Sequence, residues 1–258
     1  MKTPRQIGPY LLLSALGEPA RGNVWLATAG AQGEKLVLKI ASDSDLDGRA
    51  RLLYEVDIAM QFDHPNIMRI YECGAANEFT WISMAYVGGS HGTVTFANFR
   101  QLLLAMVHIH ANDVVHADIR YGNLLIDEFG NLRLAGFGLA RRQGDTSGVV
   151  PAPSRSPSPE QLRGQAIDTR TDIFAAGVVL FQVLTGKPPF EGSALEIMRQ
   201  IANERQVLPS EAAPGLGTSF DEVVQKALAR EKDERFGTAF EFLSAFDAAC
   251  KRGLRPTR

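Results

Sequence analysis

The sequence predicts an α+β fold with a small, sheet-rich lobe followed by a larger, mainly helical lobe. Two patterns lead to this prediction. The first third of the chain carries short alternating or β-branched apolar stretches separated by turn residues, whereas the chain after Gly88-Gly89 carries apolar residues at helical spacing. With 258 residues, of which 45% are hydrophobic, the chain is long enough to bury a sizeable core.

The first lobe shows the pattern of five strands and one helix. The helix is expected over 49–62, where Leu52, Leu53 and Val56 form an apolar side and Arg49 and Asp57 a polar one. The strands are expected at 10–15, 24–28, 35–40, 68–71 and 80–84. We therefore expect a small antiparallel sheet of five strands accompanied by one helix.

The second lobe shows five segments with helical periodicity. They lie at 96–111, 171–185, 193–204, 220–230 and 238–251. The segment 144–159 differs because it is rich in serine, proline and glycine, and it is expected to be a mobile surface loop.

Charge and cysteine content exclude several classes of partner. Lysine and arginine number 27 against 29 acidic residues, a net charge of −2, so no basic field favours nucleic acid. The longest apolar run, 173–184, is shorter than the roughly 20 residues that span a bilayer, so no direct membrane insertion is expected. Cys73 and Cys250 lack C-x-x-C spacing, which suits a reducing compartment, and we expect a cytoplasmic location. The oligomeric state stays open.

A glycine-containing turn lies between the first two long strands. Gly17 and Gly22 permit a tight hairpin whose backbone is able to approach a phosphate group. An ordinary β-hairpin with turn glycines explains the same residues, so this turn alone does not indicate a function.

A series of motifs in a fixed order extends this turn into a recognisable pattern. After the turn come Leu36-Val37-Leu38-Lys39, Glu55, Asp63-His64-Pro65-Asn66-Ile67, His116-Ala117-Asp118-Ile119-Arg120-Tyr121-Gly122-Asn123, Gly136-Phe137-Gly138, Ser158-Pro159-Glu160, Asp168 to Asp172, and Asp233-Glu234-Arg235-Phe236. This order resembles the protein kinase family, and in particular bacterial Hanks-type serine/threonine kinases. The resemblance implies one bilobal kinase-like domain over 1–258, with an N-lobe over 1–84, a hinge over 85–90 and a C-lobe over 91–258.

The resemblance implies ATP as the cofactor. The expected nucleotide-binding residues are Gly17, Gly22, Val24, Val37, Lys39, Met84, Ala85, Val87 and Leu125. Lys39 would hold the inner phosphates and Glu55 would orient that lysine. A surface lysine and a glutamate on a helix face are ordinary in any protein, and this alternative stays open at the level of sequence.

The resemblance also implies a catalytic loop. Asp118 would orient an incoming hydroxyl or accept its proton, Arg120 would contact phosphate, and Asn123 would be a metal ligand. As an alternative, Asp118 and Asn123 only stabilise their loop through hydrogen bonds to nearby backbone. The resemblance further implies a buried ion pair between Glu160 and Arg235.

One departure from the family pattern outweighs these matches. Gly136 stands where the family has an aspartate that holds magnesium across the outer phosphates, and glycine offers no side-chain ligand. Magnesium binding is therefore in doubt, because the neutral amide of Asn123 is a poor substitute for a carboxylate. Asp127 and Glu128 are expected in an exposed hairpin turn, where they do not replace it.

Other departures affect the phosphate loop and its regulation. Pro19 occupies the middle glycine position of the loop and lacks a backbone N–H, so one phosphate donor is lost. Ala117 replaces the catalytic-loop arginine that reads a phosphate on the activation segment in the family. The segment 151–157 lacks a clear substrate-docking sequence.

Two functional hypotheses follow. In the first, the chain is a pseudokinase that acts as a nucleotide-responsive or purely scaffolding module for a partner protein. In the second, it is an active serine/threonine kinase that transfers the ATP γ-phosphate to a protein substrate with atypical metal use. The retention of Asp118 favours the second hypothesis, and the loss of the metal-binding carboxylate at Gly136 favours the first.

Overall fold

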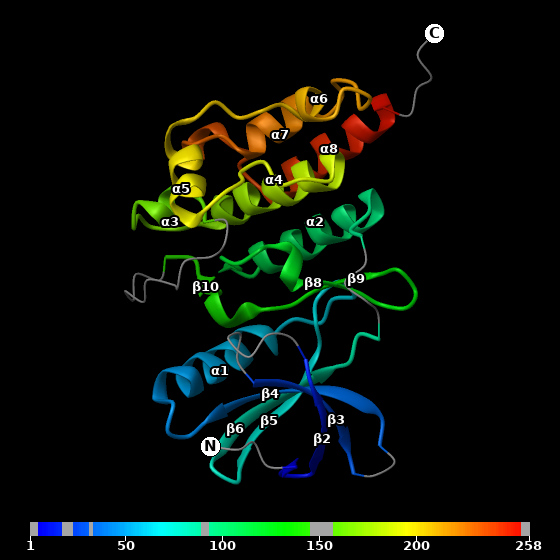
Figure 1. The fold of residues 1–258 in the computed structure, drawn as a ribbon, viewed down its shortest axis with the longest axis vertical. Helices are drawn as coiled ribbons and strands as arrows, with labels where there is room; N and C mark the ends of the chain where they lie inside the picture. The colour runs from blue at the N-terminus through cyan, green and yellow to red at the C-terminus, as the bar shows by residue number, and fades with distance from the viewer. Residues whose placement is uncertain (1–4, 17–22, 31–32, 89–92, 145–156, 254–258) are drawn as a thin grey trace. The chain divides into compact units, whose positions relative to one another are not determined.

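The computed structural model describes residues 5–16, 23–30, 33–88, 93–144 and 157–253 (Figure 1). The chain divides into two compact units. The first comprises Met1–Gly88 together with Gly136–Gly138, and the second comprises Gly89–Ala135 and Leu139–Arg258. Sequence alone groups 136–138 with the helical lobe, so their place in the first unit is a result of tertiary packing.

The first unit contains an antiparallel sheet with the strand order β1-β2-β3-β4-β6-β5. The strands are β1 (Gln6–Ile7), β2 (Tyr10–Ala15), β3 (Asn23–Ala29), β4 (Lys35–Ser42), β5 (Ile70–Ala76) and β6 (Phe79–Ala85). The α+β class is thus confirmed, but the sheet has six strands where the sequence predicts five. The additional strand, β1, has only two residues, which is too short to produce an alternating pattern.

Strand β5 begins and ends later than the predicted 68–71. Met68 is buried before the strand starts, and the pairing of β5 with β6 shifts register between Ile70 and Glu72. The residues that follow, from Cys73 to Ala76, include a glycine and two alanines and have low intrinsic β propensity. Backbone pairing with β6, which the sequence pattern does not show, therefore defines this strand.

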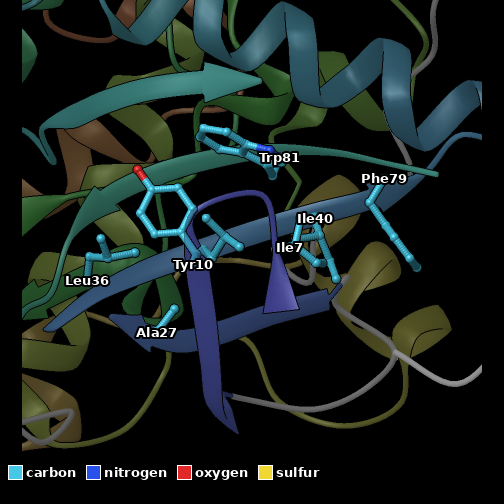
Figure 2. Packing of buried hydrophobic residues seen from close by; sticks show 8 residues of the cluster. Ile7, Tyr10, Ala27, Leu36, Ile40, Phe79 and Trp81 are labelled. Carbon is cyan, nitrogen blue, oxygen red and sulfur yellow. The ribbon is translucent and has the colours of Figure 1, made fainter. Parts of the chain in front are cut away.

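The side chains of β4 alternate between the two faces of the sheet. Leu36, Leu38 and Ile40 are buried on one face, where they join Tyr10 and Trp81 in a hydrophobic cluster (Figure 2). The Tyr10 and Trp81 rings meet edge to face with 5.0 Å between their centroids. Because successive side chains of a strand point to opposite faces, the intervening residues of β4 lie on the other face.

Helix α1 (Leu46–Ala59) packs on this other face of the sheet. Leu52 and Val56 of the helix form a buried cluster with Ala41 and Ile82 of the strands. The helix begins three residues before the predicted residue 49, because Asp45 caps its first turn by accepting a 2.9 Å hydrogen bond from the Gly48 N–H.

The second unit is mainly helical in its described residues. Its helices are α2 (Phe96–His110), α3 (Pro159–Leu162), α4 (Thr169–Thr185), α5 (Ala194–Asn203), α6 (Pro209–Ala212), α7 (Asp221–Ala227) and α8 (Ala239–Gly253), and its short strands are β7 (Val114–Val115), β8 (Leu124–Ile126), β9 (Leu132–Leu134) and β10 (Arg141–Arg142). All five predicted helices are present. The two that sequence reasoning missed, α3 and α6, have four residues each, which is too short for helical periodicity to appear.

Helices α2, α4 and α8 pack side by side and form the core of the second unit (Figure 1). Phe99, Leu102, Leu103 and Met106 of α2 have no exposed surface and lie on one side of that helix. The Phe99 ring contacts the Phe246 ring of α8 with a centroid distance of 5.0 Å. These contacts make α2 the central support for the loops that follow it.

Glycine allows helices α4 and α7 to approach closely. A Cβ atom at Gly177 would lie 2.9 Å from the Cβ of Ala227, so a larger residue would push the helices apart. In the described part of the chain, no helix is long and apolar enough to cross a membrane.

Candidate functional site

Lys39 of β4 and Glu55 of α1 form an ion pair inside the first unit. The Lys39 Nζ atom lies 2.5 Å from Glu55 Oε2. The Glu55 side chain is only 6% exposed, while that of Lys39 is 28% exposed. The pair that the sequence predicts is therefore present, and it leaves the lysine amine partly accessible to an anion.

The strand register places three of the expected apolar residues beside Lys39. Val24 of β3 is the direct cross-strand partner of Lys39. Val37 lies two residues before Lys39 on the same face, and Met84 of β6 is its cross-strand partner. Cross-strand partners share a face, so Val24, Val37 and Met84 form an apolar surface adjoining the lysine.

Ala85, the last residue of β6, still makes a backbone hydrogen bond within the first unit. The Ala85 N–H donates a 3.0 Å hydrogen bond to the Arg69 carbonyl. Val87 follows β6 and is partly exposed. These two residues were predicted to face a base through their backbones, and that role stays a prediction.

The Gly136–Gly138 segment belongs to the first unit and lies near the ion pair. A Cβ atom on Gly138 would lie 3.2 Å from Glu55 Oε2, so the segment passes close to the carboxylate. Phe137 is 2% exposed, and its ring lies 5.7 Å from that of Phe62. Gly136 has φ +87°, a backbone conformation that glycine adopts without strain and that most other residues avoid.

Asp118, Arg120 and Asn123 form a connected group in the second unit. The Asn123 Nδ2 atom donates to both the backbone oxygen of Asp118, at 2.7 Å, and its carboxylate Oδ2, at 2.8 Å. The Arg120 Nε atom lies 3.2 Å from Asp118 Oδ1. The three residues are thus brought together as the sequence predicts, and the Asn123 side chain still has its Oδ1 oxygen to offer.

Both ring nitrogens of His116 make hydrogen bonds that hold the loop carrying Asp118. The Asp118 N–H donates to His116 Nδ1 at 3.3 Å, so the ring proton lies on Nε2, which donates to the Ala135 carbonyl at 3.1 Å. The other loop alternative, in which Asp118 and Asn123 stabilise the loop, is also physically realised here. Their mutual hydrogen bonds therefore do not by themselves establish a catalytic role.

Asp172 and Gln161 hold Ala117 in place through hydrogen bonds, a role that the sequence analysis does not assign to them. Ala117 has φ +61°, which is strained for alanine. Its N–H donates to Asp172 Oδ1 at 2.8 Å, and its carbonyl accepts from the Gln161 Nε2 at 3.1 Å. Asp172 has no exposed surface and directly precedes the longest apolar run, 173–184. An acid in this position is expected to be buried, and a buried carboxylate needs hydrogen-bond partners. No sequence signal marks Gln161.

Helix α3 is tied to the rest of the second unit by a buried ion pair. Arg235 makes two hydrogen bonds to Glu160, at 2.9 and 2.8 Å, and both side chains are almost completely buried. Burial alone would raise the pKa of Glu160, but the hydrogen bonds and charge of Arg235 hold this pKa below its usual value. The ion pair expected from the resemblance is confirmed.

Ser158 and Asp127 differ from simple expectations for exposed loops. Ser158 has no exposed surface and caps α3, accepting a hydrogen bond from the Gln161 N–H, so it acts as a capping residue. Asp127 is only partly exposed, whereas the sequence predicts an exposed residue, and its carboxylate accepts hydrogen bonds from the Phe129 and Asn131 amides. Glu128 is exposed, as predicted. Burial raises and these hydrogen bonds lower the pKa of Asp127, and the net effect is a lowered pKa.

Residues 10–245 match the family model described as the protein kinase domain. The chain is 33% identical over 94% of its length to the probable serine/threonine-protein kinase PknB of Bifidobacterium longum. It is 32% identical over 95% of its length to the serine/threonine-protein kinase PknJ of Mycobacterium tuberculosis, and 32% identical over 93% to the serine/threonine-protein kinase PrkC of Bacillus subtilis. The chain belongs to the protein kinase family. These matches cover 40%, 46% and 41% of the respective relatives, so the chain spans less than half of their length.

Several residues that define a protein kinase lie outside the described part of the chain. Gly17, Gly22 and Pro19 of the expected phosphate loop belong to this group, as do residues 151–156 of the segment 151–157. Leu125, expected beside the base, lies in β8 and is partly buried. The roles of all these residues stay predictions.

Kinases generally use ATP with magnesium. The accessible ammonium of Lys39 beside an apolar surface suits a nucleotide. No group of three or more histidine, cysteine, aspartate or glutamate side chains that could hold a metal occurs among the described residues. Gly136 supplies no side-chain oxygen to a metal ion.

Proposed function

We propose that this kinase-family chain is a pseudokinase, a nucleotide-responsive or purely scaffolding module that binds a partner protein. One observation carries the proposal: Gly136 occupies the metal-binding position with a left-handed backbone, φ +87°, and without a carboxylate. A phosphoryl transfer that loses its metal clamp loses several kcal/mol of transition-state stabilisation, and each 1.36 kcal/mol lowers the rate tenfold.

The Lys39–Glu55 pair supports the nucleotide-responsive form of this proposal. The carboxylate at 2.5 Å orients the Lys39 side chain, which is partly exposed. In this proposal Lys39 binds phosphate, Glu55 positions Lys39, and Val24, Val37, Met84 and Leu125 contact the base. The boundaries 1–84, 85–90 and 91–258 for N-lobe, hinge and C-lobe remain part of the proposal.

The active-kinase alternative rests on the Asp118 group. Asp118 retains a carboxylate positioned by Arg120 and Asn123, which is the arrangement needed to orient a substrate hydroxyl. In this alternative the chain transfers the ATP γ-phosphate to a protein substrate, at a low rate and with atypical metal use. In both readings the partner is a protein, and the scarcity of cysteine favours a cytoplasmic setting.

A radiolabelled phosphotransfer assay with magnesium, with manganese and without metal separates the two readings. The pseudokinase proposal predicts no transfer above background in any condition. Transfer by the parent chain that disappears in Asp118→Asn would overturn it in favour of the active kinase. Lys39→Ala serves as a second control, because transfer that survives this change does not come from the proposed nucleotide-binding residues.

Gly136→Asp tests the argument about the metal directly. The new carboxylate is expected to make nucleotide binding at least tenfold tighter with magnesium than without it, since magnesium requires hard oxygen ligands. The positive φ of this position should cost about 1 kcal/mol of stability, and Gly136→Ala controls for this cost because it adds a Cβ atom without a ligand. Equal magnesium dependence in Gly136→Asp and Gly136→Ala would contradict the role assigned to this position.

A further inference from the structure

The second unit contains a cavity that the proposed nucleotide-binding residues do not include. It has a volume of about 180 Å³ and is lined by Glu160, Arg163 and Gln165, by Arg170 of α4 and by residues 230–233. Two parts of the chain that are far apart in the sequence therefore form its walls. One water molecule needs only about 10–15 Å³ by the same measure, so the cavity has room for a polyatomic ion with accompanying water.

Cationic side chains dominate the lining of this cavity. Four of its eight lining residues are cationic: Arg163, Arg170, Arg230 and Lys232. The three lining carboxylates are Glu160, Glu231 and Asp233. Glu160 is already neutralised by its buried ion pair with Arg235, and the Asp233 side chain is 93% exposed, so solvent screens its charge.

Two of the four cations, Arg170 and Lys232, share a carboxylate outside the lining, and Arg170 also forms an ion pair with the lining residue Asp233. Arg170 Nη2 and Lys232 Nζ each lie 2.9 Å from Asp168 Oδ2. Lys232 also donates to the Ala166 carbonyl at 2.9 Å. These contacts fix one wall of the cavity and use most of the hydrogen-bonding capacity of both side chains.

The other two cations, Arg163 and Arg230, keep much of their charge unneutralised. Arg230 is partly buried and donates to the backbone carbonyl of Glu204, but no carboxylate pairs with it in the part of the chain that the structure describes. Arg163 is 3.3 Å from Glu231, and both side chains are substantially exposed, at 39% and 64%. Such an exposed pair is weak, so the Arg163 charge is only loosely compensated.

We propose that this cavity binds a phosphate group between Arg163 and Arg230. A guanidinium group presents a planar fork of N–H donors that matches the oxygens of phosphate, and two such groups from different segments define a pocket and not only a charged surface. The side chain of Gln165 lines the same cavity and supplies a neutral donor. The ligand is inorganic phosphate or the phosphate of a phosphorylated serine or threonine, which present the same oxygens.

Isothermal titration calorimetry with inorganic phosphate tests the proposal through two opposite charge changes. Arg163→Gln combined with Arg230→Gln should weaken binding by at least about tenfold, because each removes a charged hydrogen-bond donor. Glu231→Gln should instead strengthen binding about two- to fivefold, because it removes the carboxylate that competes for Arg163. Arg100→Gln is the matched control, since it removes one exposed arginine of a surface ion pair with Asp247 and should leave the affinity unchanged.

Two further variants keep the interpretation clear. In Lys39→Ala, the phosphate binding that depends on Arg163 and Arg230 should persist, because all lining residues of the cavity belong to the second unit and Lys39 belongs to the first. The single variant Arg163→Gln carries the test if the double variant unfolds, because its side chain lies at the surface. It should weaken binding about three- to tenfold.

The source of the phosphate is distinguished by a peptide that contains phosphoserine and its unphosphorylated form. Binding of the phosphopeptide alone, tighter than free phosphate, identifies a phosphorylated protein segment as the ligand. Tighter binding of free phosphate identifies inorganic phosphate. Absence of any binding, equal affinity in all variants, loss of binding in Lys39→Ala, or weaker binding in Glu231→Gln would each overturn the proposal.

Discussion

At the scale of single residues, two positions that depart from the family pattern also have an unusual backbone conformation. Gly136 and Ala117 both have positive φ values, +87° and +61°. The glycine adopts this conformation freely, whereas the alanine is held in it by hydrogen bonds from both sides of its peptide. The loop conformation around Ala117 therefore does not depend on an arginine at that position.

The buried pair of Glu160 and Arg235 should dominate the stability of α3. Arg235→Leu leaves the Glu160 carboxylate buried without its partner and should lower the free energy of unfolding by about 3–5 kcal/mol. Urea unfolding followed by circular dichroism measures this change. The double variant Glu160→Leu/Arg235→Leu should lose less than the single one, and Arg100→Leu, in an exposed pair, less than about 1 kcal/mol. A single variant as stable as the parent would contradict this account.

Asp168 should make the stability of the protein depend on acidic pH. Burial opposes its ionisation, but hydrogen bonds from Arg170 and Lys232 hold the pKa of Asp168 at about 2, below the ordinary 3.8. Because folding lowers this pKa, the contribution is present above about pH 4 and is lost as the pH falls through about 2. It should amount to about 1 kcal/mol after solvent screening of a partly exposed group.

Asp168→Asn isolates this contribution. Asparagine retains a side-chain oxygen for the cap of α4, which accepts from the Arg170 N–H in the parent, but it does not titrate. Urea unfolding between pH 5 and about pH 2 should therefore show a shallower loss of stability for the variant than for the parent. Identical pH profiles would show that Asp168 is not the group responsible.

At the scale of elements, the short helix α3 is connected by a side-chain hydrogen bond to the loop that carries Asp118. Ser158 caps the helix, and Gln161 completes the cap with its Oε1 oxygen while its Nε2 atom reaches Ala117. Four residues cannot form a stable helix alone, so α3 exists because its ends are bound. One side chain thereby serves both the helix and the neighbouring loop.

Gln161→Leu should loosen the loop around Ala117 more than it affects the fold. The variant removes the cap hydrogen bonds that Gln161 accepts from Ser158 and also the hydrogen bond that it donates to the Ala117 carbonyl. Loss of the contact with Ala117, worth about 1 kcal/mol, should speed hydrogen exchange of the Ala117 amide about fivefold. Ser158→Ala is the matched control, because it removes a cap of α3 but leaves the Gln161–Ala117 hydrogen bond in place. If both variants change exchange at Ala117 equally, the effect belongs to the helix and not to this contact.

At the scale of the whole molecule, nucleotide binding should be visible as thermal stabilisation. A ligand that binds only the native state at about ten times its Kd contributes about 1.4 kcal/mol, which raises Tm by about 3–5 °C for a chain of this size. We expect ATP to produce such a shift equally with magnesium and with EDTA. Differential scanning fluorimetry measures it, and Lys39→Ala should abolish it. A shift that requires magnesium would contradict the loss of the metal clamp.

Much of the fold was predictable because long elements carry their own periodicity. The five long helices of the second unit and four of the six strands in the sheet of the first unit fall close to their expected positions. Element boundaries and the shortest elements were not predictable, since β1, α3 and α6 contain too few residues for a pattern and β5 is defined by its partner strand. The candidate site was predictable for Lys39 and Glu55 through ordered motifs, but no local pattern revealed the contact of Gln161.

By itself, the amino-acid sequence determined the fold class, the kinase family and the absence of a carboxylate at position 136, because these depend on residue identities and their order. Only the tertiary structure decided that Lys39 meets Glu55, that Ala117 is held by Asp172 and Gln161, and that Arg163 and Arg230 line one cavity. Those contacts join residues far apart in the chain, and packing of the elements determines their geometry.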